Sequence, residues 1–280
     1  MKNLPAESGP SGMHRIERYV RSRRMENGAY SSILSEGIGV SSIRDTDWAL
    51  RIFGMLKSHP VIPEITRSWL HSISEKIQEE GDIECTYHLV RAFLALEETL
   101  PDMALFLDRS IERLFPSGHD VFEEEGRLRE CHLWLEIETG SGSRKTARGR
   151  QRIRQFLENG MPSLILEPVD LPGLGHTLES FRFLGVGTQK LSRTLWESFQ
   201  DPGTGVRLTP ESRMSTLETA WWGVRISAGY GLSLHYPQAI LDFVDGCRTR
   251  NGGYGPRPGA VPDLESSGMA LEILGSLGLH

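Results

Sequence analysis

The chain has 280 residues, 38% of them hydrophobic, and is therefore long enough to bury a substantial core. Its formal net charge of −6 excludes a general electrostatic affinity for nucleic acid or anionic lipid. Three cysteines are few and odd in number, which argues against a disulfide scaffold and is typical of a reducing compartment.

Residues 1–12 are polar, and we expect them to form a flexible N-terminus. They lack the apolar segment that a signal peptide requires, and no apolar run elsewhere reaches the length of a membrane span. We therefore expect a cytoplasmic protein with no membrane span and no nucleic-acid partner. Residues 13–280 are expected to form a single domain.

Apolar residues at helical spacing predict paired helices along the rest of the chain. The predicted pairs are His14–Arg24 with Asp45–Leu56, Ile62–Gln78 with Ile83–Glu98, Met103–Phe115 with Arg127–Glu138, Arg144–Leu157 with His176–Leu184, Gln189–Phe199 with Thr216–Ala228, and Tyr236–Arg250 with Pro262–Leu274. A long loop with Pro162, Pro168 and Pro172 is expected inside the fourth pair. Short connections and almost no strand pattern indicate an all-α fold.

A loop followed by a helix start recurs along the chain. The best-formed copy has a glycine- and proline-rich loop at 251–259, followed by Pro262 and Asp263, which suit the first turn of a helix. Similar copies lie at 199–225 and 27–53. The acidic residue of each copy falls at Asp45, Glu84, Glu130, Glu179, Glu218 and Glu265. The steps of 39, 46, 49, 39 and 47 residues are typical of a repeat array with six units.

These six units resemble the α/α toroid shared by protein prenyltransferase β subunits and terpenoid cyclases such as squalene–hopene cyclase. The resemblance is carried by Gly252-Gly253-Tyr254, Arg257-Pro258-Gly259 and Pro262-Asp263; it is strong over 199–280 and fair over 13–57. It implies an (α/α)6 barrel, with an outer ring of helices around an inner ring and a central aromatic cavity for an isoprenoid. Because each hairpin buries its apolar face only against its neighbours, the first and last repeats are expected to meet.

The resembled transferases hold zinc with Asp, Cys and His at inner helix starts, and this chain does not keep that set. Asp263 is present, but Glu265 and Ser266 follow it where a thiolate or imidazole ligand is needed. Cys85 and Cys131 lie in other repeats. We therefore expect no zinc and no resident cofactor, with magnesium left open as the companion of a diphosphate substrate.

Asp45-Thr46-Asp47 resembles a shortened form of the acidic motif with which class II terpenoid cyclases protonate an alkene or epoxide. Paired carboxylates in an apolar cavity can keep one carboxyl group neutral for this task. Trp48 stands where a further aspartate would be, and helix-start electrostatics also explain Asp45. Asp47 has no acidic counterpart in the other repeats and is the more informative candidate.

His132 occupies the position of Asp47 in its own repeat, two residues after the recurrent acid. If both side chains point inward, they predict a catalytic acid and base pair. The alternative is a histidine that serves packing. The helical position alone does not decide which face of the ring these residues occupy.

Aromatic residues recur within the six predicted inner helices. Their faces suit an isoprenoid chain and can stabilise a carbocation, although large aromatics also simply fill helical cores. The candidates for a substrate-binding wall are Trp48, Tyr87, Trp134, Phe181, Trp221 and Trp222.

Two groups of arginines are candidates for binding a diphosphate. In the resembled family the contacts come from inner-helix ends and loops, which here correspond to Arg91, Arg225 and Arg257. The second group is the basic run from Arg144 to Arg154, which we interpret as a solvated outer face.

Three hypotheses follow from the sequence. The first is a zinc-independent isoprenoid-handling enzyme with an aspartic acid catalyst and an aromatic cavity. The second is a prenyltransferase β-like subunit that needs a partner protein, which predicts an exposed apolar patch. The third is a non-catalytic toroid that binds a lipid or a protein.

Overall fold

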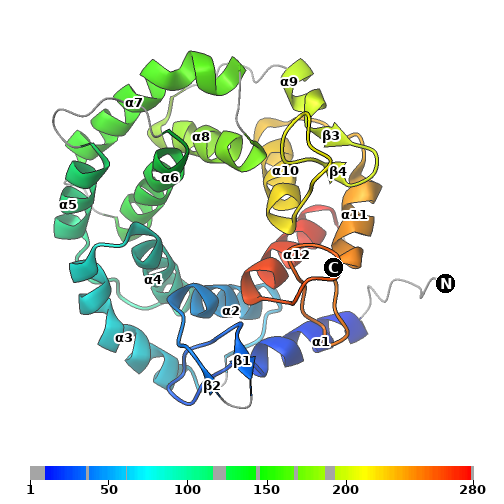
Figure 1. Cartoon of the computed structure of the whole chain (residues 1–280). Coiled ribbons are helices and arrows are strands. Elements are labelled where there is room, and N and C mark those ends of the chain that lie inside the picture. Colours follow the sequence, from blue (N-terminus) through cyan, green and yellow to red (C-terminus); the bar gives the residue numbers. More distant parts are fainter. Residues whose placement is uncertain are drawn as a thin grey trace. The chain divides into compact units, whose positions relative to one another are not determined.

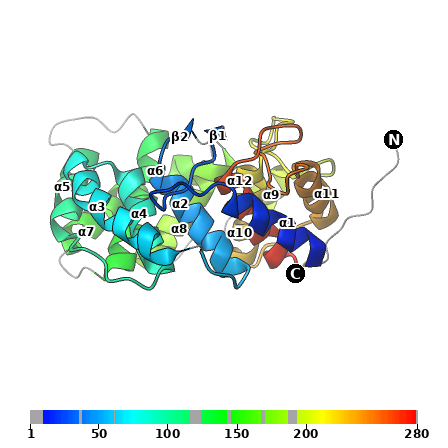
Figure 2. The same ribbon diagram turned by 90° about the horizontal axis from the view of Figure 1, so that it is seen from below.

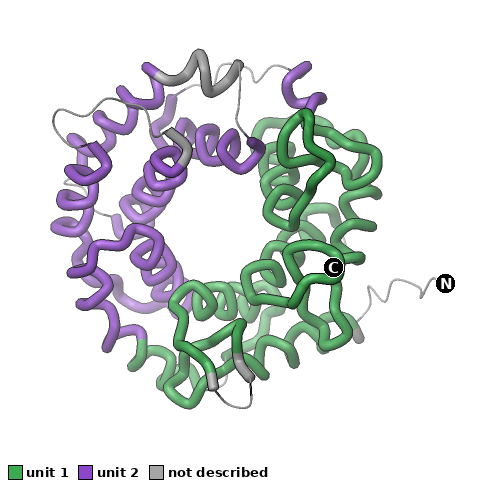
Figure 3. The backbone as a smooth tube through the Cα atoms, viewed as in Figure 1, with its two compact units in different colours: residues 1–69, 199–280 green, residues 70–198 purple. Residues whose placement is uncertain are grey.

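The computed structural model describes residues 10–35, 38–60, 62–115, 124–142, 146–166, 170–186 and 193–278. Across these ranges the chain is mostly helical, and the described strands form two short antiparallel hairpins, which confirms the all-α class. None of the helices in these ranges is long and apolar enough to cross a membrane. The chain divides into unit 1, residues 1–69 and 199–280, and unit 2, residues 70–198 (Figure 3).

Unit 1 combines the two ends of the sequence. Its helices α2 (Ile43–Met55), α12 (Leu264–Ser276) and α10 (Leu217–Tyr230) form a row with α12 in the middle (Figure 1). Helix α1 (Pro10–Arg21) packs on α2, while α11 (Pro237–Gly246) packs on the hairpin of β3 (Gln200–Asp201) and β4 (Gly205–Val206). The hairpin of β1 (Leu34–Ser35) and β2 (Ile38–Gly39) directly precedes α2 (Figure 2).

Unit 2 also consists of a row of helices with a second layer of helices packed against it. Helices α4 (Ile83–Ala95), α6 (Glu124–Ser141) and α8 (Leu171–Leu184) form a row, and α5 (Ala104–Leu114) and α7 (Ala147–Leu166) pack against α6 and α8. The core lies between the layers and includes Leu107, Trp134, Ile153 and Phe181. Helix α3 (Pro63–Glu80) begins in unit 1 and continues into unit 2, and α9 (Arg193–Ser198) ends unit 2.

The recurrent helix start is an N-cap. In five helices of the two rows, a short polar side chain accepts a hydrogen bond from the backbone N–H three residues later, which satisfies one of the unpaired donors of the first turn. These caps are Ser42 for α2, Asp82 for α4, Asp170 for α8, Thr216 for α10 and Asp263 for α12. The sequence prediction of repeated helix starts therefore has a common local cause.

The fourth repeat differs from its prediction. Helix α8 begins at Leu171 rather than His176, with Pro172 in its first turn, where a missing N–H costs nothing. Glu179 therefore lies well inside α8 and Glu130 well inside α6, so neither marks a helix start. Pro162 lies within α7 instead of a loop. At the N-terminus, α1 begins at Pro10, so part of the predicted flexible segment is helical.

The turn before α2 is held by side chains as well as backbone. The side-chain Oδ1 of Asn27 accepts a hydrogen bond from the Ala29 N–H (3.1 Å). The Tyr30 N–H donates to the Thr46 hydroxyl on α2 (3.0 Å), which in turn donates to the backbone of the cap. The turn is thereby tied to the first turn of its helix.

The turn before α12 repeats these bonds near the other end of the chain. Asn251 accepts a hydrogen bond from the Gly253 N–H (3.2 Å). The Tyr254 N–H donates to the Ser267 hydroxyl on α12 (2.9 Å), and Ser267 donates to the backbone of the cap. The match between the two turns shows that two of the predicted copies, the first and the last, have the same local structure.

The first and last repeats contact each other within unit 1, as the sequence predicts. The Tyr19 hydroxyl of α1 donates to the Pro262 carbonyl oxygen (2.9 Å), and the Leu264 N–H of α12 donates to the Ser32 hydroxyl (3.0 Å). Helices α2 and α12 then pack along each other, so residues more than two hundred positions apart share one interface.

Candidate functional site

Asp45 connects the turn before α2 to the helix. Its two carboxylate oxygens accept hydrogen bonds from the backbone N–H (2.7 Å) and the hydroxyl (2.6 Å) of Ser32. Ser32 in turn accepts the Leu264 N–H, so this carboxylate supports the contact between the first and last repeats. Asp45 therefore serves as a hydrogen-bond acceptor where the first and last repeats meet.

Asp47 lies two residues further along α2 than Asp45 and is fully buried. Its predicted partner His132 lies on α6 in unit 2, so the acid and base pair of the sequence stays a prediction. Of the two aspartates, Asp47 is the one whose carboxylate is enclosed by the core.

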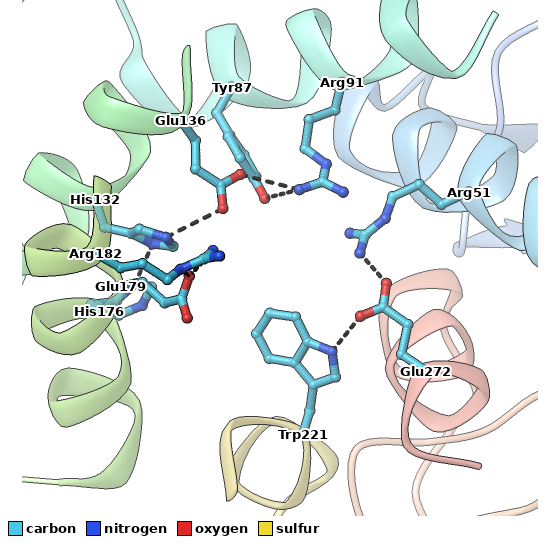
Figure 4. A network of polar contacts seen from close by, with 10 residues as sticks. All are labelled: Arg51, Tyr87, Arg91, His132, Glu136, His176, Glu179, Arg182, Trp221 and Glu272. Carbon is cyan, nitrogen blue, oxygen red and sulfur yellow. Dashed lines mark hydrogen bonds and ion pairs between the residues drawn. The ribbon is translucent and has the colours of Figure 1, made fainter. Parts of the chain in front are cut away.

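Unit 1 brings three of the predicted binding residues into one cluster. The guanidinium carbon of Arg51 lies 3.7 Å from the centroid of the Trp48 ring, and that of Arg225 lies 4.5 Å from the Trp221 ring. Glu272 joins the two aromatic and cationic pairs, since it accepts the Trp221 indole N–H (2.6 Å) and forms an ion pair with Arg51 (Figure 4). The tryptophan–arginine cluster, as we refer to these five residues, therefore spans α2, α10 and α12.

The back of this cluster is packed tightly. Trp222 is 1% exposed and meets Trp221 edge to face, with ring centroids 4.9 Å apart. Gly268 of α12 lies against the Trp48 indole so closely that a Cβ at this position would overlap the ring. Trp222 thus serves the core, while Trp221 is 9% exposed and Arg225, which stacks on it, is half-buried.

Unit 2 carries a second polar network, drawn in the same view (Figure 4). Arg91 of α4 donates to the Tyr87 hydroxyl (2.8 Å) and to Glu136 of α6 (3.1 Å). The other oxygen of Glu136 lies 3.3 Å from Nε2 of His132, and Nδ1 of His132 lies 2.8 Å from Nδ1 of His176 on α8. Three neighbouring helices therefore contribute to one chain of contacts.

Two predicted binding residues of unit 2 belong to its core instead. Trp134 is 1% exposed and donates its indole N–H to the Leu107 carbonyl oxygen of α5 (3.1 Å), and Phe181 is buried in the same cluster. Arg257 of unit 1 is exposed in its loop, where its carbonyl oxygen accepts the Ala260 N–H (3.0 Å). This position braces the turn through the backbone.

The basic run has a structural role where it is described. Arg154 donates to the Leu184 carbonyl oxygen at the end of α8 (2.9 Å), and Arg152 donates to the Phe115 carbonyl oxygen at the end of α5 (2.6 Å). Cations suit the unpaired carbonyl groups of helix C-termini. Residues 144–145 lie outside the described part of the chain.

A cleft of about 480 Å³ opens in unit 2 beside the start of α4 and the side of α6. Its lining includes Asp82, Glu84, Arg113, Arg129 and Glu130, and no aromatic residue occurs among the described residues that form it. Burial raises the pKa of Glu130 above its ordinary value, with Asp82 contributing in the same direction. This cleft is charged and is not the aromatic cavity that the resemblance implies.

Sequence reasoning missed Arg51, Glu136, His176 and Glu272. A sequence signal was available for Glu136 and Glu272. In several helices of the two rows, a residue that takes part in these contacts is followed four residues later by a charged residue. The pairs are Tyr87 with Arg91, His132 with Glu136, Trp221 with Arg225, and Gly268 with Glu272. Residues four apart share a helical face, so these pairs mark the face that carries both networks.

Within the described residues, no group of three or more His, Cys, Asp or Glu side chains could hold a metal ion. Burial, together with the carboxylates of Asp82, Glu84 and Glu80, raises the pKa of the Cys85 thiol to about 11, and burial also raises that of Cys131.

Asp263, the N-cap of α12, is expected to make the stability of the contact between the first and last repeats depend on pH. Burial raises the pKa of Asp263 above its ordinary 3.8 and the Asp45 carboxylate adds to the rise, although hydrogen bonds from Ser266 oppose it. The folded state therefore holds this proton more tightly than the unfolded state, and the free energy of unfolding falls as pH rises from 3.8 through the raised pKa.

We expect Asp263→Asn to become more stable relative to the unmodified protein as pH rises through this window. Asparagine caps helices as well as aspartate does, so the cap is retained while the carboxyl titration is removed. Urea unfolding of both proteins at a series of pH values measures the difference. A difference that is constant or shrinks with rising pH would contradict the expectation.

Comparison of the chain with protein-family models and with curated proteins finds no match.

Proposed function

We propose that the protein is a zinc-independent, isoprenoid-handling enzyme of the terpenoid cyclase and prenyltransferase type, with its six helical hairpins completed into a ring. The single observation that carries this proposal is the tryptophan–arginine cluster of unit 1, in which two indole rings and two guanidinium groups lie together on three helices. The contact between the first and last repeats supports the ring.

The cluster fits the two chemical parts of a prenyl diphosphate. Indole rings offer apolar area for the hydrocarbon and electron-rich faces for a developing carbocation. Guanidinium groups bind phosphate oxygens through paired, charge-assisted hydrogen bonds. Glu272 holds the edge of Trp221 and the head of Arg51, so it would orient both parts of the site.

Asp47 is the proposed acid, because it is the buried member of the Asp45 and Asp47 pair. Asp45 already accepts two hydrogen bonds from Ser32, a role that suits a junction better than proton donation. Substituting Asp47→Asn and measuring the conversion of a linear isoprenoid tests the assignment. An unchanged rate would remove Asp47 from the mechanism.

Calorimetry with farnesyl and geranylgeranyl diphosphate tests the binding site. We expect Arg225→Met, which keeps the apolar stem over Trp221, to weaken binding by about 10- to 100-fold, since a hydrogen bond to a charged group contributes roughly 1.5–3 kcal/mol. Arg257→Met, on an exposed loop, is the matched control and should bind as the unmodified protein does.

Inorganic diphosphate in the same experiment separates the two parts of the ligand. Weaker binding of inorganic diphosphate than of its prenyl esters is expected, since the indoles contribute only when a hydrocarbon is present. If calorimetry detects no heat of binding with either prenyl diphosphate, the enzyme proposal is wrong. That result would favour a toroid that binds another lipid or a protein.

A further inference from the structure

The charged cleft of unit 2 has no part in the isoprenoid proposal. Its volume of about 480 Å³ lies within the range of roughly 300–1,000 Å³ that is typical of small-molecule sites. Its described lining comes from α4 and the turn before it, from α5 and from α6. Beside the charged residues, this lining includes the apolar side chains of Ile83, Leu114 and Leu133. The cleft therefore suits a ligand that has both charged and apolar parts.

Most of the charged groups in the cleft already have partners within the protein. The Asp82 carboxylate accepts a backbone N–H of α4 (2.8 Å) as the N-cap of that helix. Glu84 and Arg129 form an ion pair at 2.9 Å, in which each neutralises the other. Among the described residues of the lining, Glu130 and Arg113 are the charged groups that remain for a ligand.

The Glu130 carboxylate lacks hydrogen-bond donors. Burial raises its pKa above the ordinary value, and the Asp82 carboxylate adds to the rise. The guanidinium groups of Arg127, Arg113 and Arg129 oppose this rise without reversing it. A hydrogen bond to a carboxylate lowers its pKa, and none from the described residues contributes at Glu130. An ammonium group in the cleft would supply both the charge and the donors.

Arg113 is held in place by the turn before α4. It donates a hydrogen bond to the Gly81 carbonyl oxygen (2.6 Å), and its guanidinium group lies so close to Gly81 that a Cβ there would overlap it. Its charge acts on Glu130, but these two described residues form no ion pair with each other. Guanidinium groups bind carboxylates through paired, charge-assisted hydrogen bonds. The cleft therefore offers a positioned cation together with a separate carboxylate.

We propose that this cleft binds a zwitterionic α-amino acid with an apolar side chain. The ammonium group of the ligand pairs with Glu130, its carboxylate pairs with Arg113, and its side chain packs against Leu114 and Leu133. A ligand with only one kind of charge would satisfy one of these two groups and meet repulsion from the other. The site uses residues of unit 2 alone, so it does not depend on the isoprenoid proposal.

Calorimetry on the unmodified full-length protein with leucine and two truncated forms of leucine tests this assignment. Isopentylamine lacks the carboxylate of leucine, and 4-methylpentanoate lacks its ammonium group. We expect leucine to bind at least about tenfold more tightly than either, because each truncation removes hydrogen bonds between charged groups. The proposal is wrong if millimolar leucine does not bind, or if isopentylamine binds as tightly as leucine.

Substitutions that remove one charge at a time locate the site. Glu130→Gln and Arg113→Gln should each weaken leucine binding by about tenfold. The matched controls are Glu79→Gln and Arg109→Gln, which remove the same charges from a neighbouring hollow and should leave leucine binding unchanged. Equal losses in the cleft variants and the controls would mean that leucine responds to the overall charge of the surface, which would overturn the proposal.

The pH dependence of binding tests the role of Glu130 without relying on the folding of a variant. An ammonium group pairs with the ionised carboxylate, so leucine should bind more tightly as pH rises through the raised pKa of Glu130. The Glu130→Gln protein should lose this dependence. An affinity of the unmodified protein that stays constant across this range of pH would show that Glu130 does not hold the ammonium group.

Discussion

Replacing Gly252 with alanine is expected to lower the free energy of unfolding by about 2–5 kcal/mol, the sum of left-handed backbone strain and overpacking. Gly252 has a φ of +96°, which residues with a side chain rarely adopt. A Cβ at this position would also lie 2.6 Å from the carbonyl oxygen of Arg15 in α1, and backbone cannot turn aside as a side chain can. Denaturant unfolding measures the loss.

Gly259→Ala is the matched control for this prediction. Gly259 lies in the same loop with a φ of +79°, but no atom lies within 4 Å of where its Cβ would be. Its substitution should cost only the backbone strain, about 1–2 kcal/mol. If the two variants lose equal stability, the close approach of the loop to α1 does not contribute to the stability of unit 1.

Removing the carboxylate of Glu272 is expected to cost about 2–4 kcal/mol, somewhat less than the loss of one partner from a fully buried ion pair. The Arg51 side chain is only 11% exposed, and Glu272→Ala leaves both this guanidinium and the Trp221 indole N–H without their acceptor. Thermal or denaturant unfolding measures the effect. Glu272→Gln should lose less, because the amide oxygen can still accept one of the two donors.

Glu265→Ala tests the same interface at an exposed position. Glu265 pairs with Arg44 across α2 and α12, as Glu272 pairs with Arg51, but the Arg44 side chain is 45% exposed. An exposed pair contributes at most about 1 kcal/mol. A loss from Glu265→Ala as large as that from Glu272→Ala would mean that burial does not distinguish the two pairs.

Local signals explain what could be predicted from the sequence. The N-caps of α2, α4 and α12 lie beside the predicted helix starts, because a polar cap followed by an apolar helical pattern is readable within a few residues. The two matching turns were readable for the same reason, since Asn27-Gly28 and Asn251-Gly252 stand at equivalent places. The start of α8 was predicted late because Pro172 reads as a helix breaker, although proline is tolerated in a first turn.

The networks depend on distant partners, which no local pattern reveals. Arg51 and Glu272 are 221 residues apart, and His132 and His176 are 44 residues apart. Aromatic recurrence predicted Trp48 and Trp221 and also Trp134 and Phe181, because the sequence does not distinguish a helix face turned to the second layer from the opposite face. The structure separates them through the Trp134 bond to Leu107 on α5.

The interface between α2 and α12 also affects how the protein is made. A ribosome delivers α2 first, and Glu272, which pairs with Arg51, emerges 221 residues after its partner. Until α12 has emerged, the nascent chain exposes an indole ring and a guanidinium group that the folded protein encloses. Chains that stop before α12 therefore present this surface to chaperones and proteases.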